Sequence, residues 1–269
     1  MYREYFRLRE EPFSITPDPR FLYLTAQHQE ALNHLLYGIR ERKGFIALTG
    51  EVGTGKTTLC RKLLDGLDAS CHTALILNPL LSETQLLRAI VDEFGIEHRR
   101  RDRLGYMTVL NDFLLSASSS GRDALLIIDE AQDMSAGLLE MTRLLSNLET
   151  DSRKLLQILL AGQPELRQKL RSPTLRQLDQ RIAVRYHLKP MSLEETGQYI
   201  RFRLHVAGGD ERVAFDDHAV EAVFRHSGGT PRLVNAIGDK ALLAGFVSGT
   251  RQIDAETVER AAHDLKEAA

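Results

Sequence analysis

The sequence predicts an α/β protein in which a parallel sheet flanked by helices is followed by a small helical domain. Five short apolar runs alternate with segments of helical spacing up to about residue 188. Strands that alternate with helices form a parallel sheet that is covered on both faces. After "LKPMS" (188–192) only helical spacing continues. We therefore predict an α/β body at 1–190, which includes an N-terminal arm, and a helical domain at 191–269.

The first segment, "EEPFSITPDPRFLYL", contains three prolines and therefore cannot be helical throughout. We predict an extended arm with five apolar anchors: Phe13, Ile15, Phe21, Leu22 and Tyr23. Apolar residues then recur at helical spacing, which predicts a helix over 26–42.

The five apolar runs predict buried strands at 44–49, 73–78, 124–129, 155–162 and 184–188. Helical patterns separate them at 57–67, 82–94, 104–118 and 135–148.

The helical domain opens with a capping box, because Ser192 is followed three residues later by Glu195. This predicts a helix from there to about Val206, and three more follow at 216–226, 231–247 and 254–266, the last capped by Asp254.

The third of these helices begins in "GGTPRLVNAIG" (228–238), where Thr230 suits the N-cap and Pro231 the first helical position. Arg232 follows on the opening turn, where the helix dipole already favours an anion. Either Arg232 is an ordinary surface residue or an anionic ligand comes to this helix end.

Composition narrows the class of protein. The 35 basic and 37 acidic residues give a net charge of −2, which does not favour nucleic acid or an anionic membrane as a partner. The two cysteines lack the spacing of a metal site. No apolar run approaches the ~20 residues that span a bilayer, and the first twenty residues do not form a secretory signal. We therefore expect a cytoplasmic protein.

The strongest motif is "GEVGTGKTT" (50–58), which follows a predicted strand and opens a predicted helix. That context is the one required of a phosphate-binding loop. Glycines let the backbone N–H groups turn toward phosphate oxygens, the lysine faces the terminal phosphates, and the threonine directly after the lysine suits Mg²⁺. The predicted ATP-binding residues are Gly50, Gly53, Thr54, Gly55, Lys56, Thr57 and Thr58, with Thr57 as a metal ligand.

The second motif is "LLIIDEAQ" (125–132), an apolar strand that ends in two carboxylates. Asp129 would lie at the carboxyl edge of the sheet beside the phosphate loop, where it can hold Mg²⁺ through water. Glu130 would point the opposite way, as strand neighbours do, and can orient and polarise the attacking water.

Two further motifs each leave an alternative open. In "AGQPEL" (161–166), Gln163 either contacts the γ-phosphate or the attacking water, or it belongs to a plain turn made by Gly162 and Pro164. In "LRQLDQRIAVRYHL" (175–188), an arginine either reaches a neighbouring subunit's nucleotide or lies on the surface. The three arginines there are Arg176, Arg181 and Arg185.

The order of these motifs, together with "PFSITPDPRFLYL" and "NLETDSRKLLQILLAGQPELRQKL", resembles the AAA+ ATPases of the ExeA/GspA group. These ATPases are associated with the general (type II) secretion pathway, and the likeness covers nearly the whole chain. The resemblance implies a P-loop NTPase fold with residues 191–269 as a lid. It implies that Gln163 is the first sensor, Arg181 an arginine finger and Arg232 the second sensor. It also implies that Phe13 and Ile15 lie by the adenine.

From this resemblance we expect a Mg²⁺-dependent ATPase that converts ATP to ADP and drives assembly of an envelope secretion or pilus machine. The expected partners are further copies of the chain, in a nucleotide-dependent oligomer such as a ring, and an inner-membrane protein. Members of the group commonly continue into a transmembrane helix and a peptidoglycan-binding module, so this is either an excised ATPase domain or a shorter relative. The alternative function is a DNA-associated regulator of transposition that uses ATP as an assembly switch, although the net charge disfavours nucleic acid.

Overall fold

The computed structural model describes residues 1–14, 18–67, 70–99, 101–150, 153–209 and 213–267. The chain forms two compact units. The α/β unit comprises His28–Gly50 and Lys56–Leu188, and the helical unit comprises Met1–Gln27, Glu51–Gly55 and Lys189–Ala269. The N-terminal arm therefore groups with the C-terminal helices, whereas we had placed it in a body spanning 1–190. Its apolar side chains explain the difference, because they belong to the core of the helical unit.

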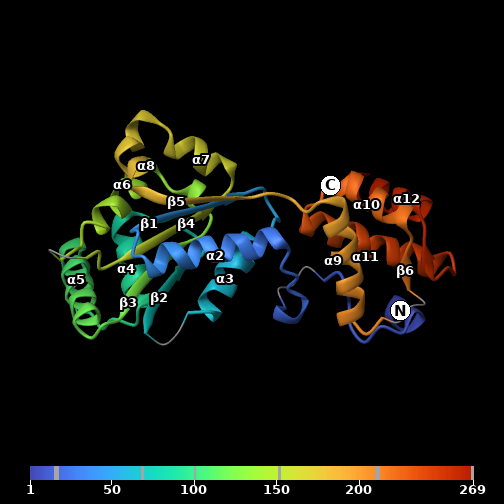
Figure 1. Cartoon of the computed structure of the whole chain (residues 1–269), viewed down its shortest axis with the longest axis horizontal. Coiled ribbons are helices and arrows are strands. Elements are labelled where there is room, and N and C mark those ends of the chain that lie inside the picture. The colour runs from blue at the N-terminus through green and yellow to red at the C-terminus, as the bar shows by residue number, and fades with distance from the viewer. Residues whose placement is uncertain (15–17, 68–69, 100, 151–152, 210–212, 268–269) are drawn as a thin grey trace. The chain divides into compact units, whose positions relative to one another are not determined.

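The α/β unit contains a five-stranded parallel sheet in the order β2-β3-β4-β1-β5 (Figure 1). The predicted parallel sheet is thus confirmed. Its strands are β1 (Phe45–Gly50), β2 (Cys71–Ile76), β3 (Asp123–Ile128), β4 (Gln157–Gly162) and β5 (Ile182–Leu188).

Helices cover both faces of this sheet, and alternate residues of each strand face opposite sides. On β1, Phe45 packs into one apolar cluster with α4, α5, α6, α7 and α8, whereas Ile46 packs into another with α2 and α3. Strands buried on both faces read as continuous apolar runs, which is why the sequence revealed them. The helices are α2 (Ala26–Arg40), α3 (Lys56–Asp65), α4 (Glu83–Glu93), α5 (Arg103–Ser119), α6 (Ala136–Leu145), α7 (Pro164–Leu170) and α8 (Arg176–Arg181).

Short elements of this unit were not predicted. Helices α7 and α8, and the 3-10 turns η2 (Ala131–Asp133) and η3 (Pro173–Leu175), are seven residues or fewer. One or two turns of helix show no clear 3.6-residue period, so apolar spacing does not reveal them.

The helical unit contains α1 (Tyr2–Phe6), the 3-10 turn η1 (Pro19–Phe21), α9 (Leu193–Val206), α10 (Asp217–Ser227), α11 (Pro231–Val247) and α12 (Ala255–Glu267). The capping box of Ser192 and Glu195 is confirmed, as is the cap by Asp254, whose Oδ1 accepts the N–H of Thr257 at 2.9 Å. Thr230 occupies the N-cap of α11 and Pro231 its first position, as predicted, although the side chain of Thr230 makes no capping hydrogen bond.

The expectation that strands stop after residue 192 is also wrong. Two strands of two residues each, β6 (Ala214–Phe215) and β7 (Gln252–Ile253), pair in parallel within the helical unit. Strands of this length have no measurable alternation, so the sequence pattern gave no signal for them.

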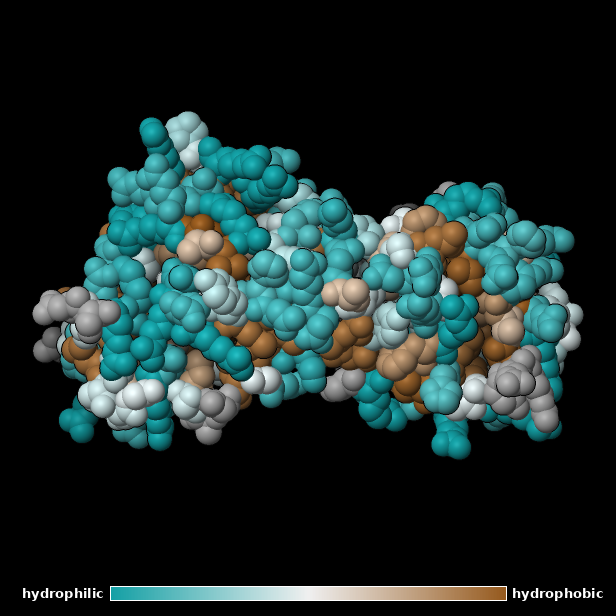
Figure 2. Space-filling model, viewed as in Figure 1, coloured by the Kyte–Doolittle hydropathy of each residue, from teal (hydrophilic) through white to brown (hydrophobic). Residues whose placement is uncertain are grey.

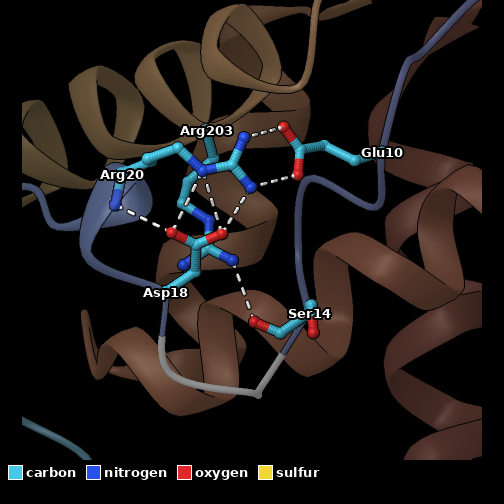
Figure 3. A network of polar contacts seen from close by, with 5 residues as sticks. All are labelled: Glu10, Ser14, Asp18, Arg20 and Arg203. Carbon is cyan, nitrogen blue, oxygen red and sulfur yellow. Dashed lines mark hydrogen bonds and ion pairs between the residues drawn. The ribbon is translucent and has the colours of Figure 1, made fainter.

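A buried arginine of α9 holds the N-terminal arm (Figure 3). Arg203 is 6% exposed, and its Nη2 donates to the backbone oxygen of Ser14 at 2.9 Å while its Nε donates to that of Pro12. Its guanidinium carbon lies 4.6 Å from the ring centroid of Phe21. A guanidinium between carbonyl oxygens and an aromatic ring is stabilised by charge-assisted hydrogen bonds and cation–π attraction. The arm is therefore an integral part of this unit.

A second arginine closes the arm on itself. Arg20 pairs with Glu10 at 2.7 Å and with Asp18 at 2.6 Å, so two arm segments are joined at the surface (Figure 3).

Hydrophilic side chains cover most of the face of the molecule in Figure 2, with apolar patches between them. Among the described residues, no helix combines the length and the apolar character that crossing a membrane requires.

Candidate nucleotide-binding site

The loop between β1 and α3 has the backbone that its glycines predict. Gly53 and Gly55 adopt φ values of +79° and +99°, in the region that favours glycine. The hydroxyl of Thr54 donates to the backbone oxygen of Glu51 at 2.8 Å, which closes the turn from within. The loop leads directly into the first turn of α3, where backbone N–H groups and the helix dipole favour an anion.

Lys56 is the first residue of α3 and is 6% exposed. Its Nζ donates to the backbone oxygen of Gly50 at 2.8 Å, so the ammonium group is held inside the loop. A buried cation beside a helix N-terminus is a strongly electropositive site, and an anionic ligand there would offset the cost of burying the charge. Thr58, the next residue after Thr57, is exposed.

The predicted magnesium ligands lie together. The hydroxyl of Thr57 donates to Oδ2 of Asp129 at 2.5 Å, and Asp129 is 2% exposed. A hydroxyl and a carboxylate are the hard oxygen donors that Mg²⁺ prefers, so these residues fit the ion. Among the described residues, no group of three or more His, Cys, Asp or Glu side chains is placed to hold a metal.

Glu130 follows Asp129, but both residues lie beyond the strand on which the predicted orientation was based. Strand β3 ends at Ile128, and Glu130 has a φ of +51° in the left-handed region. A left-handed turn, rather than the alternation of a strand, therefore sets its direction. A non-glycine residue held in this region is strained, and such strain clusters at functional sites. The backbone N–H of Glu130 donates to Oδ1 of Asp129 at 3.0 Å, which fixes the carboxylate of Asp129 relative to the backbone of Glu130.

Gln163 lies where the end of β4 meets Glu130. Its Nε2 donates to Oε2 of Glu130 at 3.4 Å, and it occupies the N-cap position of α7 with Pro164 next. Gln163 thus lies at the break before α7, and its side chain contacts Glu130. Its role as a sensor of the γ-phosphate stays a prediction.

Arg181 ends α8 and turns toward the end of α6. Its Nη1 donates to Oγ of Ser146 at 3.0 Å and to Oδ1 of Asn147 at 2.5 Å. Arg185 instead pairs with Asp179 at 3.0 Å, and Arg176 is exposed. These contacts distinguish Arg181 from its neighbours, while its role as an arginine finger stays a prediction.

The remaining candidates belong to the helical unit. Arg232 is exposed on the first turn of α11, and a Cβ at Gly53 would lie 2.6 Å from the Cβ of Arg232. Phe13 is 1% exposed and packs edge-on against Phe215, so its ring is part of the core. An adenine contact for Phe13 stays a prediction, and Ile15 lies outside the described residues.

Sequence reasoning missed two residues around Glu130. Gln132 contacts both Glu130 and Gln163, and Lys169 on α7 donates to the backbone oxygen of Gln132. The position of Gln132 two residues after Glu130 was the one available signal. Cys60 on α3 belongs to the core rather than to this group of polar residues. Its side chain is buried, and burial raises the pKa of its thiol.

This geometry agrees with comparisons to known proteins. Residues 39–170 match the family described as "AAA domain". Together with the phosphate-binding loop and the parallel sheet, this match shows that the chain contains an AAA domain with the P-loop ATPase fold.

The chain is a relative of "General secretion pathway protein A" of Aeromonas hydrophila, with 48% identity over 266 residues. The match covers 98% of this chain and 48% of that protein, so the chain spans about half its length. The predicted resemblance is thereby confirmed.

Solved structures support the fold. ORC2 of Aeropyrum pernix, in ADPNP-ADP complexes, matches with a TM-score of 0.66 and 17% identity over 97% of this chain and 72% of that chain. The RuvB Holliday junction branch migration motor of Thermotoga maritima matches with a TM-score of 0.59 and 20% identity over 88% of this chain and 69% of that chain. At these identities the likeness concerns the fold alone.

Proposed function

We propose that this chain is a Mg²⁺-dependent ATPase that hydrolyses ATP to ADP and phosphate. The observation that carries the proposal is the 2.5 Å hydrogen bond between Thr57 of the phosphate-binding loop and Asp129, with Glu130 fixed beside it. In this proposal the segments that follow β1 and β3 supply the phosphate-binding loop, the oxygen ligands for a metal and the carboxylate base.

Each side chain has a separate task in the proposed reaction. Lys56 faces the terminal phosphates and offsets their negative charge. Thr57 and Asp129 would hold Mg²⁺, which would supply positive charge to offset that of the phosphates. Glu130 orients a water molecule and accepts its proton as the water oxygen bonds to the γ-phosphorus. The bond from that phosphorus to the bridging oxygen breaks, and ADP leaves with the electron pair. Gln163 contacts the γ-phosphate or the attacking water.

Two variants test this proposal, with ATP affinity and phosphate release measured for each. Lys56→Ala should lose ATP binding, because the charge that faces the terminal phosphates is gone. Glu130→Gln should bind ATP and stall, because an amide keeps the shape of the side chain but cannot accept the proton. Equal hydrolysis by Glu130→Gln and the wild type would remove Glu130 from the mechanism. ATP binding without turnover by the wild type would make the chain a nucleotide-binding scaffold.

We further propose that this ATPase acts as a homo-oligomer that drives assembly of an envelope secretion machine, together with an inner-membrane partner protein. The name of the Aeromonas relative and the 48% identity support this role. Light scattering tests the oligomer: Glu130→Gln with ATP should form a larger species than the nucleotide-free chain. A monomer under both conditions at micromolar protein would contradict an oligomeric mechanism.

The second candidate is a DNA-associated AAA+ regulator of transposition. The net charge of −2 speaks against it, because DNA-binding proteins usually carry a basic face. A mobility-shift measurement with duplex DNA at physiological salt separates the two. An ATP-dependent shift would replace the secretion role by the DNA-associated one.

A further inference from the structure

The side chain of Gln132 uses both ends of its amide inside the proposed site. Its Nε2 donates to Oε2 of Glu130 at 2.8 Å, and its Oε1 accepts the backbone N–H of Gln163 at 3.0 Å. A backbone N–H can only donate and an ionised carboxylate can only accept, so one orientation of the amide satisfies both neighbours. Gln132 therefore connects the turn after β3 to the end of β4.

The surroundings leave this amide little freedom. A Cβ at residue 162 would lie 2.8 Å from Oε1 of Gln132, so Gly162 makes room for the amide. The ammonium of Lys169 donates to the backbone oxygens of Gln132 and Met134 at 2.5 and 2.7 Å. Ala131 and Met134, on either side of the turn, are fully buried. The backbone that carries Gln132 is thus anchored both by the core and by α7.

Two amide donors converge on the same oxygen of Glu130. Gln132 approaches Oε2 at 2.8 Å and Gln163 approaches it at 3.4 Å. The backbone of Glu130 is strained at a φ of +51°, so its side chain needs outside contacts to keep one orientation. With Oε2 engaged by donors, Oε1 is the oxygen that remains for the proton of the attacking water.

We propose that Gln132 is a positioning residue that fixes the carboxylate of Glu130, so that Oε1 receives the proton of the water. The same amide links Glu130 to Gln163, so the two residues keep a constant separation during turnover. This assignment rests on the proposed role of Glu130 as the base.

The decisive variant is Gln132→Glu, which keeps the length of the side chain and the acceptor for the N–H of Gln163 but removes the donor to Glu130. We expect ATP affinity within about twofold of the wild type and a kcat lower by at least about tenfold. Gln132→Asn is one methylene shorter and cannot span both contacts, and it should lower kcat in the same way without adding charge. Gln168→Glu, on the exposed face of α7, adds the same charge and should leave kcat unchanged.

A double variant separates positioning from general damage to the fold. If Gln132 acts through Glu130, then Gln132→Asn alone should hydrolyse ATP more slowly than the wild type in a single turnover. The double variant should then be no slower than Glu130→Gln alone. A further loss in the Glu130→Gln background, equal losses of ATP affinity and kcat, or wild-type turnover of Gln132→Glu would each overturn the assignment. Wild-type turnover of Glu130→Gln would remove Glu130 from the mechanism, and this assignment with it, whereas absence of turnover in the wild type would overturn the proposed function itself.

Discussion

Thr57 and Asp129 are 72 residues apart in the sequence, yet the hydroxyl of the first donates to the carboxylate of the second at 2.5 Å. Thr57 lies on α3, which follows β1, and Asp129 follows β3 directly. Strand β4 lies between β3 and β1 in the sheet, so the crossover that inserts β4 brings together a hydroxyl and a carboxylate from distant parts of the sequence.

This pair predicts the metal dependence of ATP binding. Thr57→Val removes the hydroxyl but keeps the branched shape, so the gain in ATP affinity on adding Mg²⁺ should fall by about tenfold or more. Thr57→Ser retains the hydroxyl and should keep that gain. Titration of a fluorescent ATP analogue with and without Mg²⁺ measures it. Undiminished Mg²⁺ dependence in Thr57→Val would exclude the residue as a ligand.

Gly53 should be intolerant of substitution for two reasons. Its φ is +79°, and an added Cβ would lie 2.6 Å from the Cβ of Arg232. We expect Gly53→Ala to lose at least about tenfold in ATP affinity, because the loop must shift. Gly95→Ala is the control, since Gly95 has a φ of +67° with nothing within 4 Å of the added Cβ. It should cost about 1–2 kcal/mol of stability through strain and leave ATP affinity unchanged. Equal ATP affinities for both variants would contradict this reasoning.

Arg203 predicts the stability of the arm. Arg203→Met keeps an apolar stem but removes the donors to the backbone oxygens of Pro12 and Ser14. The free energy of unfolding should therefore fall by about 2–3 kcal/mol. The arm should also become cleavable by a protease at low concentration. Arg201→Met, at an exposed position of the same helix, should change stability by less than about 0.5 kcal/mol. An intact arm in Arg203→Met after proteolysis would show that the apolar anchors suffice without the arginine.

Asp254 gives a pH-dependent contribution to stability. The N–H of Thr257 donates to its carboxylate and lowers the pKa of that carboxyl. The stabilisation is therefore complete above the ordinary carboxyl pKa and is lost as the pH falls through the lowered value. Asp254→Ala should cost about 1 kcal/mol at pH 7, and the difference from the wild type should shrink in acid. Asp254→Asn keeps the cap without a titrating group. Its free energy of unfolding, measured with denaturant, should therefore not lose the contribution of the cap as the pH falls.

Mixing of inactive variants tests which arginine acts between subunits. Arg181→Ala keeps a working pocket, and Lys56→Ala keeps a working arginine, so the two together should recover ATPase activity at shared interfaces. Arginine fingers contribute about 10³-fold or more, so the recovery should be large. In the α/β unit Arg181 is half-buried and donates to Ser146 and Asn147.

Arg232 should behave differently in the same experiment. Because we assign it to the nucleotide of its own subunit, Arg232→Ala mixed with Lys56→Ala should stay inactive. Phosphate release from defined mixtures measures both cases. Recovery with Arg232→Ala would assign this arginine to the neighbouring subunit's nucleotide.

The sequence predicted the sheet well, because strands buried on both faces are continuous apolar runs. It did not reveal β6 and β7, which are too short to show alternation, or the grouping of the arm with the C-terminal helices, which depends on contacts between distant residues. Within the site, the motifs predicted that Lys56, Thr57 and Asp129 would converge. The left-handed backbone of Glu130 had no signal, because that conformation usually selects glycine, asparagine or aspartate. The contacts of Gln132 depend on that turn and were equally hidden.

The sharing of one core by residues far apart in the sequence affects the order in which the protein folds during synthesis. Phe6 and Phe13 leave the ribosome long before Ile253 and Val258, which belong to the same core. At about 5–20 residues per second, the α/β unit is complete well before Ile253 and Val258 emerge. The first 27 residues must therefore remain without their core while the intervening unit folds. Because loop-closure entropy grows only slowly with length, this delay mainly costs time and exposes apolar side chains to chaperones, rather than lowering final stability.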